Sequence, residues 1–331
     1  MRVFLTGGTG LIGSRIVRKL RERGDVPVVL SRKAGPARQK LGDGVVVVEG
    51  DPMVAGGWMG AVDDCDAVMH LAGENVFARR WNATFKQMLV DSRVASTVNI
   101  VEALKRKPMR ADGANKTLVN AAAIGFYGPR GDEELTEDSP PGDDFLARLC
   151  VEWEAAARAV ESVGVRSVQV RVGVVLDKNG GALAKLLTPF EMFVGGPVGS
   201  GKQFMSWIHH DDMVGLFLFA LDTAGASGPM NGTAPNPVTN RVFSKALGKA
   251  LHRPAIFPTP GFALKLLLGE AADVVTNGQR VVPKKALALG YTFKYPTVDG
   301  ALAEICGGSA ANAIPSSLRS PIVDDSTGAN D

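Results

Sequence analysis

A glycine-rich segment follows directly on the first apolar run of the chain. Residues 3–5 lead into Thr6-Gly7-Gly8-Thr9-Gly10-Leu11-Ile12-Gly13, and a helical pattern of apolar residues begins inside this segment. A strand, a glycine turn and a helix in this order present unpaired backbone N–H groups with no Cβ in front of them, which is what a diphosphate needs. A turn that merely links a strand to a helix is the alternative, which the surrounding βαβ pattern disfavours.

Three glycines of this segment have expected roles. We expect Gly7 to permit the tight turn, Gly10 to allow a close approach of the diphosphate, and Gly13 to let the helix pack on the strand. The predicted diphosphate contacts are Gly7, Thr9, Gly10, Leu11, Ile12 and Gly13.

Short apolar runs rich in β-branched residues recur through the first half of the chain. They cover residues 3–5, 26–30, 45–48, 67–71, 118–121 and 167–175. The runs do not alternate with polar residues, which is typical of strands that are buried on both faces of a parallel sheet. Helical spacing appears between them, so the pattern predicts an α/β fold: a Rossmann doubly wound parallel sheet with a smaller C-terminal substrate lobe.

A change in pattern near residue 176 suggests the domain boundaries. We assign residues 1–176 to a dinucleotide-binding domain to which 211–235 return, and residues 177–210 and 236–306, which are richer in Gly and Pro, to the smaller lobe. Residues 307–331 are poor in apolar side chains and are predicted to be a disordered tail.

Composition narrows the partners and the compartment. The net charge is only +3, and 21% of residues are charged, so the chain lacks the positive field that nucleic acid requires. Three widely spaced cysteines form no disulfide framework, and neither a leader nor a membrane span is visible. The four histidines have no metal-ligand spacing. We therefore expect a cytoplasmic monomer or homodimer that takes a small molecule, without nucleic-acid, membrane or metal partners.

The end of the second strand indicates which dinucleotide is bound. Ser31, Arg32 and Lys33 stand where NAD-binding proteins usually carry an acid. A hydroxyl and two cations suit a 2′-phosphate, so NADP is favoured over NAD. The alternative interpretation of the same residues is a solvated basic loop. Asp51, after the third strand, is a weaker candidate to accept a hydrogen bond from the adenine amino group.

Further motifs carry a resemblance to a known family. They are Leu71-Ala72-Gly73-Glu74-Asn75, Asp91-Ser92-Arg93, Gly125-Phe126-Tyr127-Gly128, Thr136-Glu137-Asp138-Ser139-Pro140, Arg171-Val172-Gly173-Val174-Val175-Leu176, Trp207-Ile208-His209 and Asn236-Pro237-Val238-Thr239-Asn240. With the glycine turn, they make the chain resemble the extended short-chain dehydrogenase/reductases from residue 1 to about residue 306. Within these it is similar to the epimerase-family group known as NAD-dependent epimerase/dehydratase, sugar-nucleotide epimerase or cell-division inhibitor, which has its own C-terminal domain of unknown function.

The resemblance implies where the rest of the cofactor would lie. Leu71, Ala72 and Gly73 would line its ribose, and the segment from Arg171 to Val174 would flank the nicotinamide end. The remaining residues assigned to the cofactor on this basis are Arg93, Asn120, Ala121, Ala122, Arg171, Gly173 and Val174.

The chain departs from the superfamily at the catalytic positions. Members usually carry a Ser or Thr after the fifth strand and a Tyr-x-x-x-Lys on the next helix, in which the Lys lowers the Tyr pKa. Here the fifth strand ends in alanines, and the helix has Phe145 and Leu149 at the two positions. If a hydride is transferred, another group must therefore handle the proton.

Tyr127 and Glu74 are the candidate catalytic residues. Tyr127 is predicted near the mouth of the sheet, with a simple packing role as the alternative, and Glu74 follows the fourth strand at its carboxyl end. The candidate substrate contacts are Glu74, Asn75, Arg80, Tyr127, Lys202 and Trp207. His209 is interpreted as structural rather than catalytic.

Two functional hypotheses remain open from the sequence. In the first, the protein is an NADP-dependent epimerase, dehydratase or reductase that acts on a small carbonyl or hydroxyl compound, or on a nucleotide-sugar, with non-standard proton handling. In the second, it binds NADP without turnover, as a sensor or regulator. The polar residues Glu74, Asn75, Arg93 and Tyr127 favour the first, and Phe145 and Leu149 favour the second.

Overall fold

The central sheet has seven parallel strands. The structure is a computed structural model that describes residues 1–307. The strands lie in the order β11-β7-β5-β4-β1-β2-β3. Their bounds are β1 (Arg2–Thr6), β2 (Val26–Ser31), β3 (Val46–Glu49), β4 (Ala67–His70), β5 (Thr117–Ala123), β7 (Arg166–Val172) and β11 (Gly228–Gly232).

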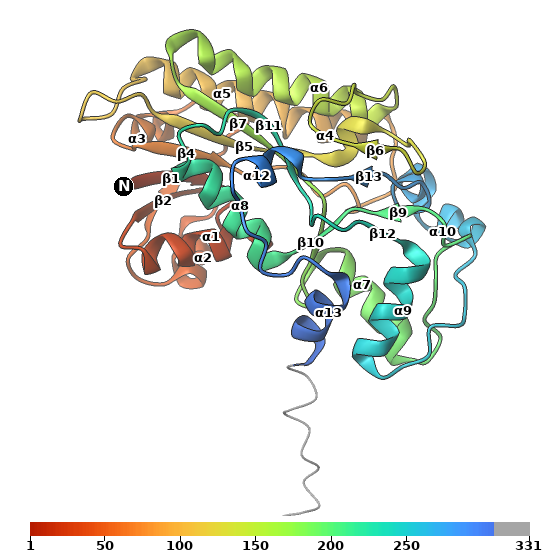
Figure 1. The fold of residues 1–331 in the computed structure, drawn as a ribbon. Coiled ribbons are helices and arrows are strands. Elements are labelled where there is room, and N and C mark those ends of the chain that lie inside the picture. Colours follow the sequence, from red (N-terminus) through yellow and green to blue (C-terminus); the bar gives the residue numbers. More distant parts are fainter. Residues whose placement is uncertain (308–331) are drawn as a thin grey trace, which may run out of the picture.

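Helices cover both faces of the sheet, with α3, α5 and α6 on one side and α1, α2 and α8 on the other (Figure 1). Along the strands, residues alternate between the two layers: Leu5 and Met69 pack toward α1 and α8, whereas Phe4 and Val68 pack toward α3 and α5. The helices of these layers are α1 (Leu11–Glu22), α2 (Ala34–Leu41), α3 (Gly60–Asp63), α4 (Ala83–Asp91), α5 (Val94–Arg106), α6 (Phe145–Arg158) and α8 (His210–Asp222). Burial on both faces explains why the strand sequences are continuously apolar.

The remaining elements gather beside the carboxyl ends of the strands (Figure 1). There α9 packs against α13, and α7 packs against α9 and β8. The strands and helices of this part are β6 (Glu134–Leu135), β8 (Val174–Leu176), α7 (Gly181–Glu191), β9 (Phe204–Met205), β10 (Trp207–His209), β12 (Val238–Thr239), α9 (Asn240–Leu251), α10 (Gly261–Leu268), α11 (Asp273–Thr276), β13 (Arg280–Val281), α12 (Lys284–Ala288) and α13 (Val298–Gly307). Four 3-10 helices complete the described chain: η1 (Gly57–Met59), η2 (Ile124–Tyr127), η3 (Ala159–Val163) and η4 (Gly269–Ala272).

The predicted α/β fold with a doubly wound parallel sheet is confirmed. One predicted strand, 167–175, is two strands: β7 stays in the sheet, and β8 leaves it to pair with β10. The break is at Gly173, whose N–H donates to the Gly232 carbonyl and where a Cβ would lie 2.5 Å from the Ser206 carbonyl oxygen.

The domain boundaries given above stay a prediction, and residues 308–331 of the predicted tail lie outside the described residues. Within residues 1–307, no helix is both long enough and apolar enough to cross a membrane.

Candidate functional site

The carboxyl ends of β1 and β4 form the centre of the candidate site. These neighbouring strands lie where the order of the sheet reverses, which is where open α/β sheets bind ligands. The two ends are in contact, because a Cβ on Gly7 would lie 2.8 Å from the carbonyl carbon of Leu71. Gly7 also has φ +68°, a left-handed conformation that favours glycine.

The first turn of α1 is open at this edge. Gly10 is the N-cap of α1, makes no side-chain capping bond, and is followed by no acid in the first turn. Gly13 lies so close to the Gly7 carbonyl oxygen that a Cβ would overlap it. No described side chain caps the backbone N–H groups at the helix start, which is the arrangement that anion sites at helix N-termini use. The predicted diphosphate contacts stay a prediction. Leu11 packs beside Gly180 and Gly181, which connect β8 to α7.

A chain of buried hydrogen bonds joins the two strand ends and continues to α5. The Thr6 hydroxyl accepts the N–H groups of Leu71 and Ala72 and therefore donates its own proton to Nδ1 of His70, at 2.6 Å. Nε2 of His70 then donates to the Ser96 hydroxyl at 3.0 Å. Complete burial lowers the pKa of His70 to about 3, so the ring is neutral at pH 7. This chain fixes the position of the Leu71-Ala72-Gly73 segment.

The end of β2 carries the residues predicted to select the dinucleotide. Arg32 and Lys33 are exposed, and neither forms an ion pair with a described carboxylate. The Ser31 hydroxyl accepts only the Lys33 N–H, at 3.3 Å. Asp51 is partly buried after β3, where one carboxylate oxygen accepts the Met53 N–H. The two residues after β2 thus present two cations that have no carboxylate partner among the described residues.

Tyr127 lies in the interior and not at the mouth of the sheet. Its side chain is fully buried, and its hydroxyl donates to Asn231 Oδ1 at 2.6 Å and accepts from an Arg171 nitrogen at 2.8 Å. Burial raises its pKa to about 12. Proton exchange between Tyr127 and a substrate does not fit this environment, because the hydroxyl is enclosed and both of its partners are protein groups.

Arg171 belongs to the same buried cluster. It forms a two-pronged ion pair with Glu154 of α6, at 2.7 and 2.8 Å, and its guanidinium carbon lies 3.5 Å from the centroid of the Phe126 ring. Only 3% of its surface is exposed. The expected contact of this side chain with the cofactor does not fit, because its guanidinium donates to Glu154 and Tyr127 inside the protein.

Phe145 and Leu149, which the resemblance assigns to the usual Tyr and Lys positions, are part of an apolar cluster. Phe145 is at the first residue of α6 and contacts Trp81 edge to face, with ring centroids 5.5 Å apart. Leu149 is buried against Phe85 and Leu89 of α4. Neither position offers a titratable group to the site.

Glu74 and Arg93 are brought together at the end of β4. Arg93 donates to the backbone carbonyls of Glu74 and Leu89, and a Cβ on Gly73 would lie 3.4 Å from its guanidinium carbon. Burial lowers the pKa of Arg93. The Glu74 side chain is partly buried and makes no hydrogen bond to a described residue. Asn75 uses its side-chain oxygen to accept the Phe77 N–H.

The other predicted contacts divide into exposed and buried residues. Arg80 and Lys202 are exposed on separate segments, whereas Trp207 is fully buried, with its indole N–H donating to the Asn236 carbonyl. A substrate contact of Trp207 does not fit this burial. The side chain of Asn120 is also fully buried, and Asn120 pairs with His70 across β5 and β4. This side chain therefore cannot reach a cofactor. Four further residues predicted to contact the cofactor lie near the carboxyl ends of β5 and β7, namely Ala121, Ala122, Gly173 and Val174.

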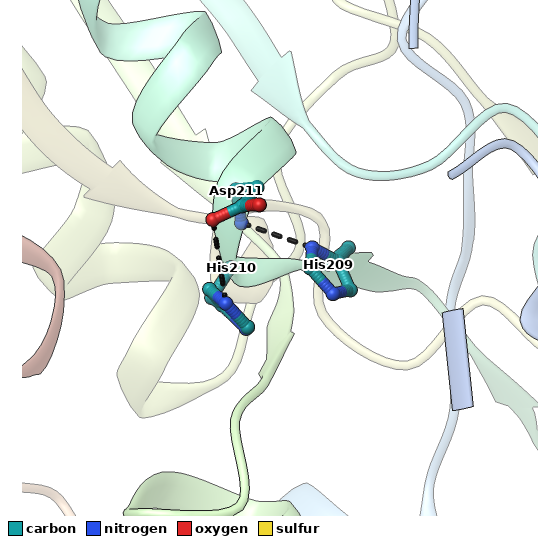
Figure 2. Close-up of side chains that lie close together, drawn as sticks. All are labelled: His209, His210 and Asp211. Carbon is teal, nitrogen blue, oxygen red and sulfur yellow. Dashed lines mark hydrogen bonds and ion pairs between the residues drawn. The ribbon is translucent and has the colours of Figure 1, made fainter. Parts of the chain in front are cut away.

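His209, His210 and Asp211 lie close enough together to suggest a metal site, as Figure 2 shows. Both ring nitrogens of His209 are nevertheless engaged, since Nδ1 accepts the Asp211 N–H at 3.0 Å and Nε2 donates to Glu304 at 2.9 Å. His209 is the N-cap of α8. We assign the three residues to the start of this helix, in line with the structural role expected for His209.

Sequence reasoning missed two features of the site. The first is the Thr6, His70 and Ser96 chain, for which the only signal is a polar residue at the end of each of two buried strands. The second is Asp177, which is fully buried and accepts two hydrogen bonds from Arg15 of α1, at 2.6 and 2.9 Å. Because 162 residues separate this pair, no local pattern reveals it.

Comparison with family models places the chain. Residues 3–231 match the model of the NAD dependent epimerase/dehydratase family, and residues 259–305 match a domain of unknown function. The chain belongs to the NAD-dependent epimerase/dehydratase family. The resemblance that the motifs indicated is thereby confirmed.

Individual relatives agree with this assignment. An "Epimerase family protein SDR39U1 homolog, chloroplastic" from Arabidopsis thaliana is 42% identical over 309 residues, which are 92% of this chain and 86% of the relative. The crystal structure of human epimerase family protein SDR39U1 with NADPH has a TM-score of 0.81 and 36% identity, and the match covers 93% of this chain and 99% of that one. A nucleoside-diphosphate sugar epimerase from Corynebacterium glutamicum gives a TM-score of 0.74 and 32% identity, over 93% of this chain and 58% of the other. Because one relative is named chloroplastic, a cytoplasmic location stays a prediction.

Proposed function

We propose that this protein is an NADPH-dependent enzyme that reduces a small carbonyl compound or catalyses the reverse oxidation. The observation that carries the proposal is the open start of α1 beside the end of β4, combined with two unpaired cations after β2. The human relative of similar fold was crystallised with NADPH, which supports the same cofactor here.

The residues of the site fit this dinucleotide. Gly7 and Gly13 leave a cradle that a Cβ would fill, and the N–H groups at the start of α1 would hold the diphosphate. Arg32 and Lys33 would grip the 2′-phosphate, and Leu71 to Gly73 would line a ribose. NADPH supplies the hydride.

Glu74 is the group that we propose for proton handling. It follows the strand that ends beside the cradle, and its carboxyl group has no partner among the described side chains. The Glu74 carboxyl group would give a proton to the carbonyl oxygen of the substrate in reduction and take it back in oxidation. Arg93, fixed on the Glu74 carbonyl, would orient this segment. The superfamily's usual donor is absent, because Phe145 occupies its position.

Turnover is tested with a panel of aldehydes and ketones, with the loss of NADPH absorbance as the readout. We expect Glu74→Gln to lower kcat by about 100-fold or more while the affinity for NADPH is unchanged, because the amide cannot transfer the proton. Glu152→Gln, the same change at an exposed carboxylate of α6, is the matched control and should leave kcat close to wild type. Equal rates for the wild type and Glu74→Gln would remove Glu74 from the reaction.

The second candidate is a protein that binds NADPH without turnover, as a sensor. The apolar packing of Phe145 and Leu149 favours it, because neither can move a proton. In this case NADPH binds, no member of the panel consumes it, and deuterium is never exchanged from labelled NADPH into a carbonyl compound.

A further inference from the structure

A cavity of about 360 Å³ lies between the segment that follows β4 and the α10–η4 region. Its lining residues are Phe77, Arg79, Arg80, Leu268 and Ala271. The first three are on the segment that begins with Glu74, and the last two belong to the part of the chain matched by the domain of unknown function. An ion pair between Lys86 of α4 and Glu270 of η4 holds the two sides together.

Positive charge gathers at this cavity without neutralisation. Neither Arg79 nor Arg80 forms an ion pair with any carboxylate in the part of the chain that the structure describes. Lys185 of α7 adds a third cation, with its ammonium 5.5 Å from the centroid of the Phe77 ring. An anionic group in the cavity would therefore find charged donors that have no other acid to bind.

The backbone is shaped around Arg80. Gly269 has φ +63°, and a Cβ at that position would lie 3.3 Å from Nε of Arg80. A larger residue would be strained and would crowd the guanidinium at the cavity wall. Gly269 thus leaves room for this arginine.

The described lining offers a sugar no acceptor side chain. Phe77, Leu268 and Ala271 are apolar, and the two arginines can only donate. Among the described residues that line the cavity, no side chain can accept a hydrogen bond from the hydroxyl groups of a sugar ring. A sugar hydroxyl that is buried there without an acceptor weakens binding, because its donor loses the water that it bonds in solution. The chemistry of the wall disfavours a nucleotide-sugar and favours an apolar body with one acidic group.

We propose that this cavity binds the apolar body and the carboxylate or phosphate group of the substrate, with Arg80 as its anchor. The inference rests on the function proposed above, since it names the substrate class of the same site. The carbonyl or hydroxyl compound that reacts is then an amphiphilic acid and not a sugar derivative. Arg79, with its guanidinium 4.9 Å from the centroid of the Phe85 ring, is held beside it.

Octanoate is a suitable probe, because it joins an apolar chain to one carboxylate. Its binding to the full chain is measured by calorimetry, with and without saturating NADPH, and compared with octanol, acetate and UDP-glucose. We expect octanoate to bind about tenfold or more tightly than either octanol or acetate, because each of these lacks one half of the contact. UDP-glucose should not displace octanoate.

Two variants test the carboxylate contact and the apolar contact separately. Arg80→Gln should weaken octanoate about tenfold or more and leave octanol unchanged, whereas Leu268→Gln should weaken octanoate and octanol alike. Arg158→Gln, the same change at an exposed arginine at the end of α6, is the matched control and should change nothing. Displacement of octanoate by UDP-glucose, or equal octanoate binding in Arg80→Gln, overturns the proposal.

An NADPH titration of the same samples keeps this inference apart from the proposed function. If NADPH binds and octanoate does not, the cavity assignment fails alone. If the wild type does not bind NADPH, the proposed function fails, whatever octanoate does.

Discussion

The turn between β1 and α1 and the start of α6 stand on either side of the same candidate site, and they differ in how they act. The turn could act through its backbone: Gly7 and Gly13 carry no side chain there, and no side chain caps the first turn of α1. The start of α6 would have to work through side chains, and here Phe145 and Leu149 are packed in an apolar cluster. The same chain therefore has a backbone turn that fits a dinucleotide and, at Phe145 and Leu149, side chains that cannot transfer a proton.

This difference shows which part of such a site can be predicted from the sequence. A cradle depends on where side chains are absent, so glycine spacing encodes it directly. Proton chemistry depends on one or two side chains whose surroundings decide their role. Tyr127 illustrates this, because its hydroxyl is turned inward to Arg171 and Asn231.

The largest expected effect comes from filling the cradle. Gly13→Ala would place a Cβ against the Gly7 carbonyl oxygen, so we expect NADPH affinity to fall by more than about 100-fold, because the turn must open. Fluorescence titration with NADPH measures it. Gly60→Ala, a helical glycine with open space around it, is the control and should bind normally. Near-native affinity in Gly13→Ala would show that the cradle is not the binding site.

Next in size is the loss of one cation after β2. Arg32→Ala should weaken NADPH about 10- to 100-fold and leave NADH almost unchanged, because only NADPH carries the 2′-phosphate. Arg18→Ala, an exposed arginine on α1, is the matched control. If both coenzymes weaken equally, Arg32 does not read the 2′-phosphate.

A third prediction concerns His70 and pH. Its folded pKa of about 3 lies below the ordinary value of 6.5, so the unfolded chain binds a proton first as pH falls. Stability from this group is complete above pH 6.5 and is lost as pH drops toward 3. From pH 7 to pH 5 the loss is about 2 kcal/mol.

Urea unfolding at the two pH values measures this loss. His70→Gln keeps polar atoms at the position but does not titrate. Between pH 7 and pH 5, its free energy of unfolding should therefore fall by about 2 kcal/mol less than that of the wild type. Equal losses in both proteins would contradict a buried neutral His70.

The smallest expected effect distinguishes a packing role of Tyr127 from a catalytic role. Tyr127→Phe removes the hydroxyl that donates to Asn231 Oδ1 and accepts from one Arg171 nitrogen, and it should lower the free energy of unfolding by about 1–2 kcal/mol, while kcat and NADPH affinity remain close to wild type. Thermal unfolding and turnover are measured on the same sample. A 100-fold lower kcat with unchanged stability would restore Tyr127 as a catalytic residue.

Much of the fold could be predicted, because alternation of apolar strands and helices determines it. β11 was not identified as a strand, since its sequence Gly-Pro-Met-Asn-Gly contains residues that rarely form strands and only the sheet context makes it one. At the site, the glycine turn could be predicted from the sequence, whereas the burial of Arg171 and Trp207 could not. Their partners Glu154 and Asn236 are distant in the chain, and nothing local indicates on which face a strand residue lies.

The most direct test of the account is a calorimetric titration of the wild-type protein with NADPH and with NADH at fixed salt. The open turn and the two unpaired cations predict that NADPH binds one equivalent per chain, about tenfold or more tightly than NADH. Equal affinities, or no binding of either coenzyme, would contradict it.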